Sequence, residues 1–245
     1  MNRHSTRTAI VTGAGKRVGR EIAEGLLADG WAVVAHVHHA GDDVPDGAVA
    51  VVADLSEAGA TEAIVGAAKG LPPLELLVNN AARFAEDRLD TLDAASFDSH
   101  MAVNVRAPAL LIQKFAESVG GGGGLVVNLL DSKLAAPNPD FLSYTLSKTA
   151  LAGLTELSAR ALAGQGIRVN GIAPALMLLS EGQDERNFEA MHRFNPLRRG
   201  VDPGDVVAAI RYLVEAPAVT GQIITIDGGQ RFWALPRDVQ FLEKT

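Results

Sequence analysis

Tyr144 and Lys148 lie four residues apart in SYTLSKTAL, a segment with helical spacing. On a helix, positions i and i+4 share a face, so the phenol and the ammonium can reach the same bound molecule. A free phenol has a pKa of about 10 and is a poor base at neutral pH. A nearby cation stabilises the phenolate and lowers this pKa towards the working range. The pair therefore indicates proton transfer, and we expect Lys148 to lower the pKa of Tyr144.

The spacing resembles the Y-x-x-x-K motif of the short-chain dehydrogenase/reductase family. That family usually has a Ser thirteen residues before the Tyr, and this chain has Asp131 there. A Ser hydroxyl can donate a hydrogen bond to a substrate carbonyl, whereas an ionised carboxylate can only accept. Asp131 suits a substrate with N–H donors, or a relay in which protonated Asp131 replenishes the Tyr144 proton. Alternatively, Ser132 is the true counterpart and Asp131 caps a turn.

An Asp-Tyr-Lys set is similar to that of the pteridine reductases, one branch of the family. The resemblance implies that Asp131, Tyr144, Lys148 and Asn104 are catalytic. Tyr144 would donate the proton, Lys148 would hold the nicotinamide ribose, and Asn104 would order a water of the proton relay.

The elements that must position these residues alternate along the chain. Apolar runs predict strands at 8–12, 31–38, 48–53, 74–78, 125–130, 167–172 and 222–226. Helical patterns lie after the first strand, at 57–69, at 93–119, around Tyr144 and at 203–213, and residues 174–196 read as irregular. Pro108 should kink its helix or mark a boundary. Alternation of this kind predicts an α/β fold, a single-domain Rossmann-type doubly wound parallel β-sheet of about seven strands with helices on both faces.

We expect residues 1–245 to form this one domain. Residues 8–120 would mainly bind the cofactor. Residues 121–245 would carry the catalytic helix, a substrate lid around 176–196 and a C-terminal tail.

A glycine-rich turn follows the first predicted strand and opens the first helix. Its glycines would let the backbone approach a pyrophosphate at the helix N-terminus. Arg17 replaces the middle Gly of the family pattern T-G-x-x-x-G-x-G, as in pteridine reductases, and could clamp a 2′-phosphate. The alternative is a solvated surface Arg. The predicted cofactor-binding residues of this turn are Gly13, Gly15, Lys16, Arg17, Val18 and Gly19.

The end of the second strand favours NADPH over NADH. NAD-specific sites place an acid there, but this chain has His36, His38 and His39, with no acid until Asp42. The histidines resemble the H-x-H segment of pteridine reductases and are expected to bind the cofactor. No Cys or carboxylate accompanies them at the spacing of a closed metal site, so we predict no metal.

Further positions match the family in order along the chain. The resemblance implies cofactor contacts from Asp54, Leu55, Asn80, Ala81, Ala82, Tyr144, Lys148 and Pro174.

The substrate pocket is expected beside these residues, with contacts from Phe84, Asp131, Tyr144 and Leu176. In pteridine reductases an aromatic at the position of Phe84 stacks on the pterin; the alternative is a Phe that covers the core edge. The tail carries Phe232, Trp233 and Phe241. It would pack across a neighbouring subunit or cover its own sheet edge, and we favour the first.

Composition excludes several classes of function. The formal net charge is −7 and there is no cysteine, which disfavours nucleic-acid binding and rules out thiolate chemistry. The start of the chain has no apolar segment typical of a signal peptide, and no run approaches the ~20 apolar residues of a membrane span. We therefore expect a cytoplasmic protein that binds neither nucleic acid nor membrane. A D-G-G segment at 227–229 resembles one near the family's tetramer interface, which implies a homotetramer.

Together these features predict an NADPH-dependent reductase that transfers hydride to an imine bond of a pterin, taking a dihydropterin or dihydrofolate to its tetrahydro form. One alternative is an NADPH-dependent carbonyl reductase acting on 3-oxoacyl thioesters or small ketones. Another is a non-catalytic NADP-binding regulator.

Overall fold

One parallel sheet forms the centre of the molecule. The computed structural model describes residues 6–179 and 183–242. Within them the strand order is β3-β2-β1-β4-β5-β6-β7, and all neighbours pair in parallel. The strands are β1 (Thr8–Val11), β2 (Ala32–Val37), β3 (Val49–Val52), β4 (Leu74–Asn79), β5 (Gly124–Leu129), β6 (Ile167–Pro174) and β7 (Ile223–Ile226). The predicted Rossmann-type doubly wound sheet is confirmed.

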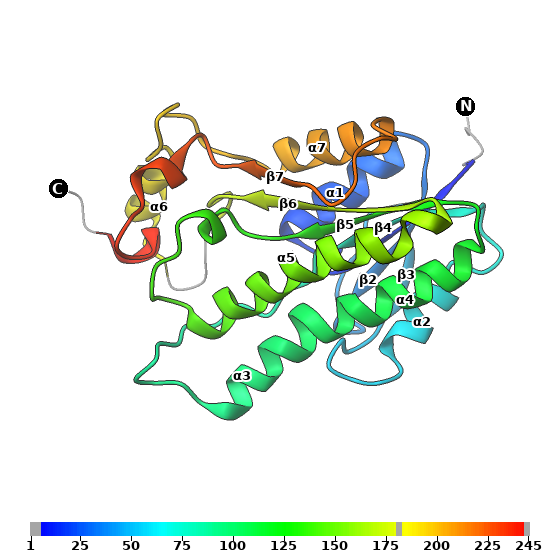
Figure 1. Cartoon of the computed structure of the whole chain (residues 1–245), viewed down its shortest axis with the longest axis horizontal. Helices are drawn as coiled ribbons and strands as arrows, with labels where there is room; N and C mark the ends of the chain where they lie inside the picture. Colours follow the sequence, from blue (N-terminus) through cyan, green and yellow to red (C-terminus); the bar gives the residue numbers. More distant parts are fainter. Residues whose placement is uncertain (1–5, 180–182, 243–245) are drawn as a thin grey trace.

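Helices cover both faces of the sheet because the side chains of each strand alternate between them. In β1, Ala9 and Val11 pack into one core and Ile10 into the other. The first core is covered by α1 (Arg17–Ala28) and α7 (Pro203–Glu215); the second is covered by α2 (Ala60–Gly66), α4 (Ala107–Val119) and α5 (Leu142–Leu162) (Figure 1). Because the central strands are buried on both faces, their sequences read as continuous apolar runs.

The predicted helix at 93–119 is divided by a π-helical segment. The helix α3 (Ala94–Met101) runs through η1 (Ala102–Arg106) into α4. Pro108 lies in the first turn of α4, where its missing N–H costs little. The predicted boundary at Pro108 is confirmed, and the wider π turn lies at Asn104.

Shorter elements gather where β5, β6 and β7 end. They are η2 (Ser132–Ala135), α6 (Glu185–His192), η4 (Gln230–Trp233) and η5 (Val239–Phe241), whereas η3 (Ala163–Gln165) lies between α5 and the start of β6. The segment 174–196, predicted to be irregular, contains the helix α6. Asp184 caps this helix by accepting a hydrogen bond from the Asn187 N–H, a signal readable from the sequence.

Candidate active site

Two adjoining cavities lie at the carboxyl ends of the strands, where ligands of open parallel sheets bind. A cavity of about 820 Å³ is lined by the glycine-rich turn and the ends of β2 and β4. A second cavity of about 500 Å³ is lined by Asp131, Tyr144 and the segment after β6. Residues common to both walls are Lys16, Arg17, Val18, Ala82 and Phe84. The two cavities therefore form one continuous site.

Asp131 and Tyr144 meet in the smaller cavity. The Tyr144 hydroxyl donates a hydrogen bond to Asp131 Oδ2 at 3.0 Å, while Asp131 Oδ1 accepts the Lys133 backbone N–H at 2.8 Å. Asp131 thus caps η2 with one oxygen and faces the phenol with the other. Ser132 lines the same cavity, but the side chain that reaches the phenol is Asp131.

Burial and charge keep the phenol protonated. Burial raises the pKa of Tyr144 well above its usual value, and the neighbouring Asp131 carboxylate raises it further. Burial also raises the pKa of Asp131. Our expectation that Lys148 lowers the Tyr144 pKa is wrong for this structure, because the hydroxyl points to a carboxylate rather than to a cation.

Lys148 is buried behind the phenol. Its ammonium donates to the Leu129 carbonyl at 2.6 Å and lies 5.7 Å from the centre of the Tyr144 ring. Burial lowers the pKa of Lys148 to about 8. The amine can therefore change its charge close to neutral pH.

Asn104 ties the loop after β4 to the catalytic helix. Its amide accepts from the Arg83 N–H at 2.7 Å and donates to the Arg83 carbonyl and to Ser147 Oγ, each at 2.9 Å. Asn104 is 1% exposed and is not among the residues that line the two cavities, so its ordering of a relay water stays a prediction.

Phe84 is the aromatic wall of the site. Its ring stacks on Phe141 with centroids 4.3 Å apart and meets the Tyr144 ring edge-on at 4.8 Å. Phe84 is 46% exposed, so it both packs on the core and presents a free face to the cavity.

Asp87, which was not predicted as a site residue, holds the start of α5. Its carboxylate accepts from the Ser143 N–H at 2.9 Å and from the Ser143 hydroxyl, 56 positions away. The residue at the N-cap position, Phe141, has φ +53° and supplies no side-chain cap. The loop that carries Phe84 therefore supplies the cap for the helix that carries Tyr144. Because the two residues are 56 positions apart, no local sequence pattern predicts this pair.

The glycine-rich turn is built for close approach of backbone groups. A Cβ at Gly19 would lie 2.0 Å from the Gly13 oxygen. Asn80 supports the turn by donating to the carbonyls of Thr12 and Gly13. The side chain of Lys16, the N-cap residue of α1, makes no hydrogen bond with the first N–H groups of this helix. These features fit a phosphate-bearing dinucleotide at the helix N-terminus.

His36 supports the turn from within the protein. It is 2% exposed, its Nδ1 accepts from the Gly13 N–H at 3.2 Å, and its Nε2 donates to the Ala53 carbonyl at 3.0 Å. Burial lowers the pKa of His36 and thereby favours this neutral tautomer. Both ring nitrogens are used by the protein, although His36 is among the residues that line the larger cavity, so its contact with the cofactor stays a prediction.

The other two histidines lie exposed on the wall of the larger cavity. His38 Nε2 is 3.4 Å from Asp54 Oδ2, and the His38 and His39 rings are 4.1 Å apart. Hydrogen bonds from the Ser56 N–H and hydroxyl lower the pKa of Asp54. A carboxylate and two imidazoles thus surround the expected adenosine end of the site.

Arg17 spans from the turn to the segment after β6. Its guanidinium donates to the Leu179 carbonyl at 2.8 Å and to the Leu178 carbonyl at 3.4 Å, and its backbone has φ +54°. Arg17 is exposed, as the alternative of a solvated Arg expected, and it also lines both cavities. Clamping of a 2′-phosphate by Arg17 stays a prediction.

The remaining predicted residues divide between cavity wall and interior. Leu176 lines the smaller cavity. Pro174 is buried at the end of β6, in register with Ile226. The residues that line the larger cavity include Gly15, Lys16, Val18, Leu55, Asn80, Ala81 and Ala82. Of the expected lid, residues 180–182 lie outside the described part of the chain.

The C-terminal tail folds over its own active site. Arg237 Nε donates to Asp140 Oδ2 at 2.7 Å, and the Phe241 ring stacks on Phe141 at 5.6 Å. Leu235 and Asp238 line the smaller cavity. The tail as far as residue 242 thus packs on the wall of its own substrate cavity. Its packing across a neighbouring subunit, which we favoured, stays a prediction; residues 243–245 lie outside the described residues.

Residues 6–179 and 183–242 contain no group of three or more His, Cys, Asp or Glu side chains placed to hold a metal ion. No helix among them is long and apolar enough to cross a membrane.

Comparison with known proteins places the chain among oxidoreductases. Residues 13–231 match the protein family described as Enoyl-(Acyl carrier protein) reductase. Pteridine reductase 1 of Leishmania tarentolae is 31% identical, with 90% of this chain and 95% of that protein covered. Carbonyl reductase [NADPH] 2 of Sus scrofa is 32% identical, with coverages of 90% and 95%. The crystal structure of FolM Alternative dihydrofolate reductase 1 from Brucella suis in complex with NADP is similar at TM-score 0.86 and 35% identity, with coverages of 94% and 97%.

Proposed function

The chain belongs to the short-chain dehydrogenase/reductase family of oxidoreductases, and we propose that it is an NADPH-dependent pterin reductase. Its substrate would be a dihydropterin or dihydrofolate, whose ring C=N bond is reduced to the tetrahydro form. The observation that carries this proposal is the hydrogen bond from Tyr144 to Asp131 in a cavity walled by Phe84.

Asp131 favours a nitrogen heterocycle over a ketone. A carbonyl reductase must stabilise negative charge that develops on the substrate oxygen, and donors rather than carboxylates do this. A pterin presents ring and exocyclic N–H groups, which a carboxylate can accept. Phe84 offers a free aromatic face, and offset stacking with a ring contributes about 1 kcal/mol beyond the burial of area.

The larger cavity suits NADPH, and its lining residues all fall within 8–120, as the proposed cofactor-binding half requires. The turn at Gly13 and the N-terminus of α1 would hold the pyrophosphate. Lys16 and Arg17 supply positive charge, and β2 ends in histidines rather than in an acid, which suits a 2′-phosphate. When bound, NADPH supplies the hydride for the ring carbon.

The protein supplies the proton for the ring nitrogen. Tyr144 is the donor, and its raised pKa keeps it protonated at neutral pH. Asp131, whose pKa is also raised, can return a proton to Tyr144 or accept a substrate N–H. Lys148, held by the Leu129 carbonyl, would position the cofactor ribose. Asn104 would order the relay water between these three side chains and solvent.

Carbonyl reduction remains the second candidate, because Ser132 lines the same cavity and a carbonyl reductase is among the relatives. Following NADPH oxidation with 7,8-dihydrobiopterin, dihydromonapterin, dihydrofolate, an acetoacetyl thioester and small ketones separates the two. Turnover confined to dihydropterins or dihydrofolate supports the proposal; turnover confined to carbonyls refutes it.

A cytoplasmic homotetramer is part of the proposal. Leu110 on α4 and Leu146 and Leu157 on α5 are exposed apolar side chains, which an interface between copies would cover. Sedimentation at several protein concentrations tests this, and a monomer at micromolar concentration would contradict it.

A further inference from the structure

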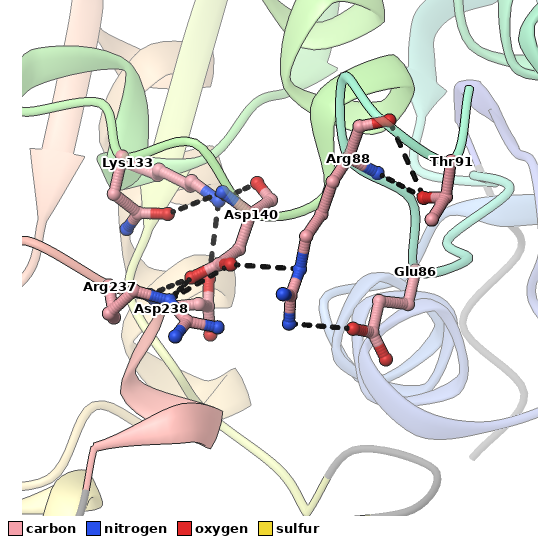
Figure 2. A network of polar contacts seen from close by, with 8 residues as sticks. Glu86, Arg88, Thr91, Lys133, Asp140, Arg237 and Asp238 are labelled. Atoms are coloured by element: carbon pink, nitrogen blue, oxygen red, sulfur yellow. Dashed lines mark hydrogen bonds and ion pairs between the residues drawn. The ribbon is translucent and has the colours of Figure 1, made fainter.

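The C-terminal tail forms part of the wall of the substrate cavity, and an ion network holds it there. Arg237 Nε bonds both carboxylate oxygens of Asp140, at 3.0 and 2.7 Å, and the Asp238 N–H donates to Asp140 Oδ2 at 2.8 Å. Asp140 is 1% exposed. Figure 2 shows these side chains converging from the tail and from the loop before α5. These contacts therefore fix the tail segment against the loop that carries Asp140.

Lys133 connects this network to the catalytic carboxylate. Its backbone N–H donates to Asp131 Oδ1 at 2.8 Å, and its ammonium lies 3.4 Å from Asp238 Oδ2. The ammonium also donates to the Asp140 carbonyl (Figure 2). One residue thus holds Asp131 with its backbone and Asp238 with its side chain.

Asp238 presents a second carboxylate to the cavity. Its side chain is 19% exposed and lines the cavity together with Asp131 and Tyr144. The Gln240 N–H donates to Asp238 Oδ1 at 3.1 Å, which leaves lone pairs on both oxygens. Burial is the main cause of the raised pKa of Asp131, and the negative charge of Asp238 raises this pKa further.

We propose that Asp238 is a second substrate-facing carboxylate, which acts with Asp131 to bind the N–H-rich edge of a 2-aminopyrimidinone ring. This inference rests on the proposed pterin reductase function. Two carboxylates that share a site do not both ionise readily. Asp131 therefore holds a proton to higher pH than it would alone, while Asp238 accepts N–H groups. The charged and titratable groups around Asp131 are Tyr144 and Lys148 from α5, Lys133 from η2, Asp238 from the tail, and Lys16, Arg17, Arg231 and Arg237 on the cavity wall.

The test compares Asp238→Asn with wild type in steady-state reduction of 7,8-dihydrobiopterin across pH. Asparagine preserves the shape and the acceptor for the Gln240 N–H but removes the charge. We expect KM for the dihydropterin to rise about tenfold or more, as for a lost charged hydrogen bond. KM for NADPH should not change, because Asp238 does not line the larger cavity. The pH above which activity is lost should move down, because the Asp131 proton leaves more easily.

Glu75→Gln is the matched control, because Glu75 is an exposed carboxylate near the amino end of β4, whereas the site lies at the carboxyl ends of the strands. It should leave both KM values and the pH profile unchanged. Asp238→Glu, which restores the charge, should restore the pH profile. If Asp238→Asn does not fold, Asp238→Ser takes its place, because the hydroxyl retains a cap acceptor.

An unchanged KM for the dihydropterin or an unmoved pH profile in the Asp238 variant would overturn the inference. Failure of the proposed function looks different: wild type would then reduce no dihydropterin at any pH. If wild type reduced only ketones, their pH profile in Asp238→Asn would still test the link from Asp238 to Asp131, while binding of the pterin edge would be refuted.

Discussion

Replacing Asp131 by Asn tests the proposed mechanism at its central contact. The amide is nearly isosteric and can keep the hydrogen bond from the Lys133 N–H with its oxygen. Its NH₂ group, which is a donor, then faces the Tyr144 hydroxyl, which in the wild-type protein donates to Asp131 Oδ2 at 3.0 Å. The variant therefore loses the group that accepts substrate N–H and that returns a proton to Tyr144, while the fold of the site is preserved.

The expected magnitude follows from burial of the contact. A hydrogen bond to a charged group contributes roughly 1.5–3 kcal/mol, which corresponds to about a 10- to 100-fold loss in kcat/KM. The Asp131 charge is also one cause of the raised pKa of Tyr144. Without that charge the Tyr144 pKa falls, so the pH above which the phenol loses its proton also falls.

The assay is NADPH oxidation with 7,8-dihydrobiopterin across pH, beside Asp131→Ser, which installs the residue usual in the family. Both variants should lose pterin reduction with little change in KM for NADPH, and Asp131→Ser alone should gain reduction of small ketones. Thermal unfolding confirms that the variants are folded. If Asp131→Asn and Asp131→Ser reduce dihydropterins at the wild-type rate with intact binding, Asp131 has no part in the mechanism.

Three further predictions concern the frame of the site. Gly19→Ala places a methyl 2.0 Å from the Gly13 oxygen. NADPH binding, titrated by fluorescence, should therefore weaken, and the stability of the protein should fall by about 1–3 kcal/mol. Unchanged NADPH binding would refute this prediction. Burial lowers the pKa of His36 below its usual 6.5, so the unfolded chain binds more protons and stability should fall as pH drops below about 6.5. Denaturant unfolding should show that His36→Phe is less stable by about 1–3 kcal/mol and has lost this pH dependence, whereas an identical profile would assign it to other groups. Asp87→Ala removes the cap of α5, so the protein should lose about 1 kcal/mol of stability and kcat should fall. Asp87→Asn should recover kcat. Equal kcat in both variants would exclude a positioning role for Asp87.

Much of this architecture follows from local patterns. The strands were predictable because buried parallel strands read as apolar runs, and α5 was predictable from its spacing. The contact between Asp131 and Tyr144 was anticipated from a spacing of thirteen residues and a family resemblance. The glycine-rich turn was predictable because close backbone approach leaves only glycine at positions such as Gly19.

The rest depends on contacts between distant segments. Arg237 and Asp140 are 97 positions apart, and Asp87 and Ser143 are 56 apart, so neither pair leaves a local pattern. The hydrogen bond from the Gly13 N–H to His36 was not predictable, because the sequence around His36 does not reveal that this N–H needs an acceptor. The raised pKa of Tyr144 likewise depends on burial, which spacing alone does not report.

The most direct test of the account is NADPH oxidation by the wild-type protein and Tyr144→Phe with 7,8-dihydrobiopterin, dihydrofolate and an acetoacetyl thioester. The account predicts turnover of a dihydropterin or dihydrofolate that falls by at least about 100-fold in Tyr144→Phe, with NADPH binding retained. Turnover of the thioester alone, or pterin turnover that survives the loss of the phenol, would contradict it.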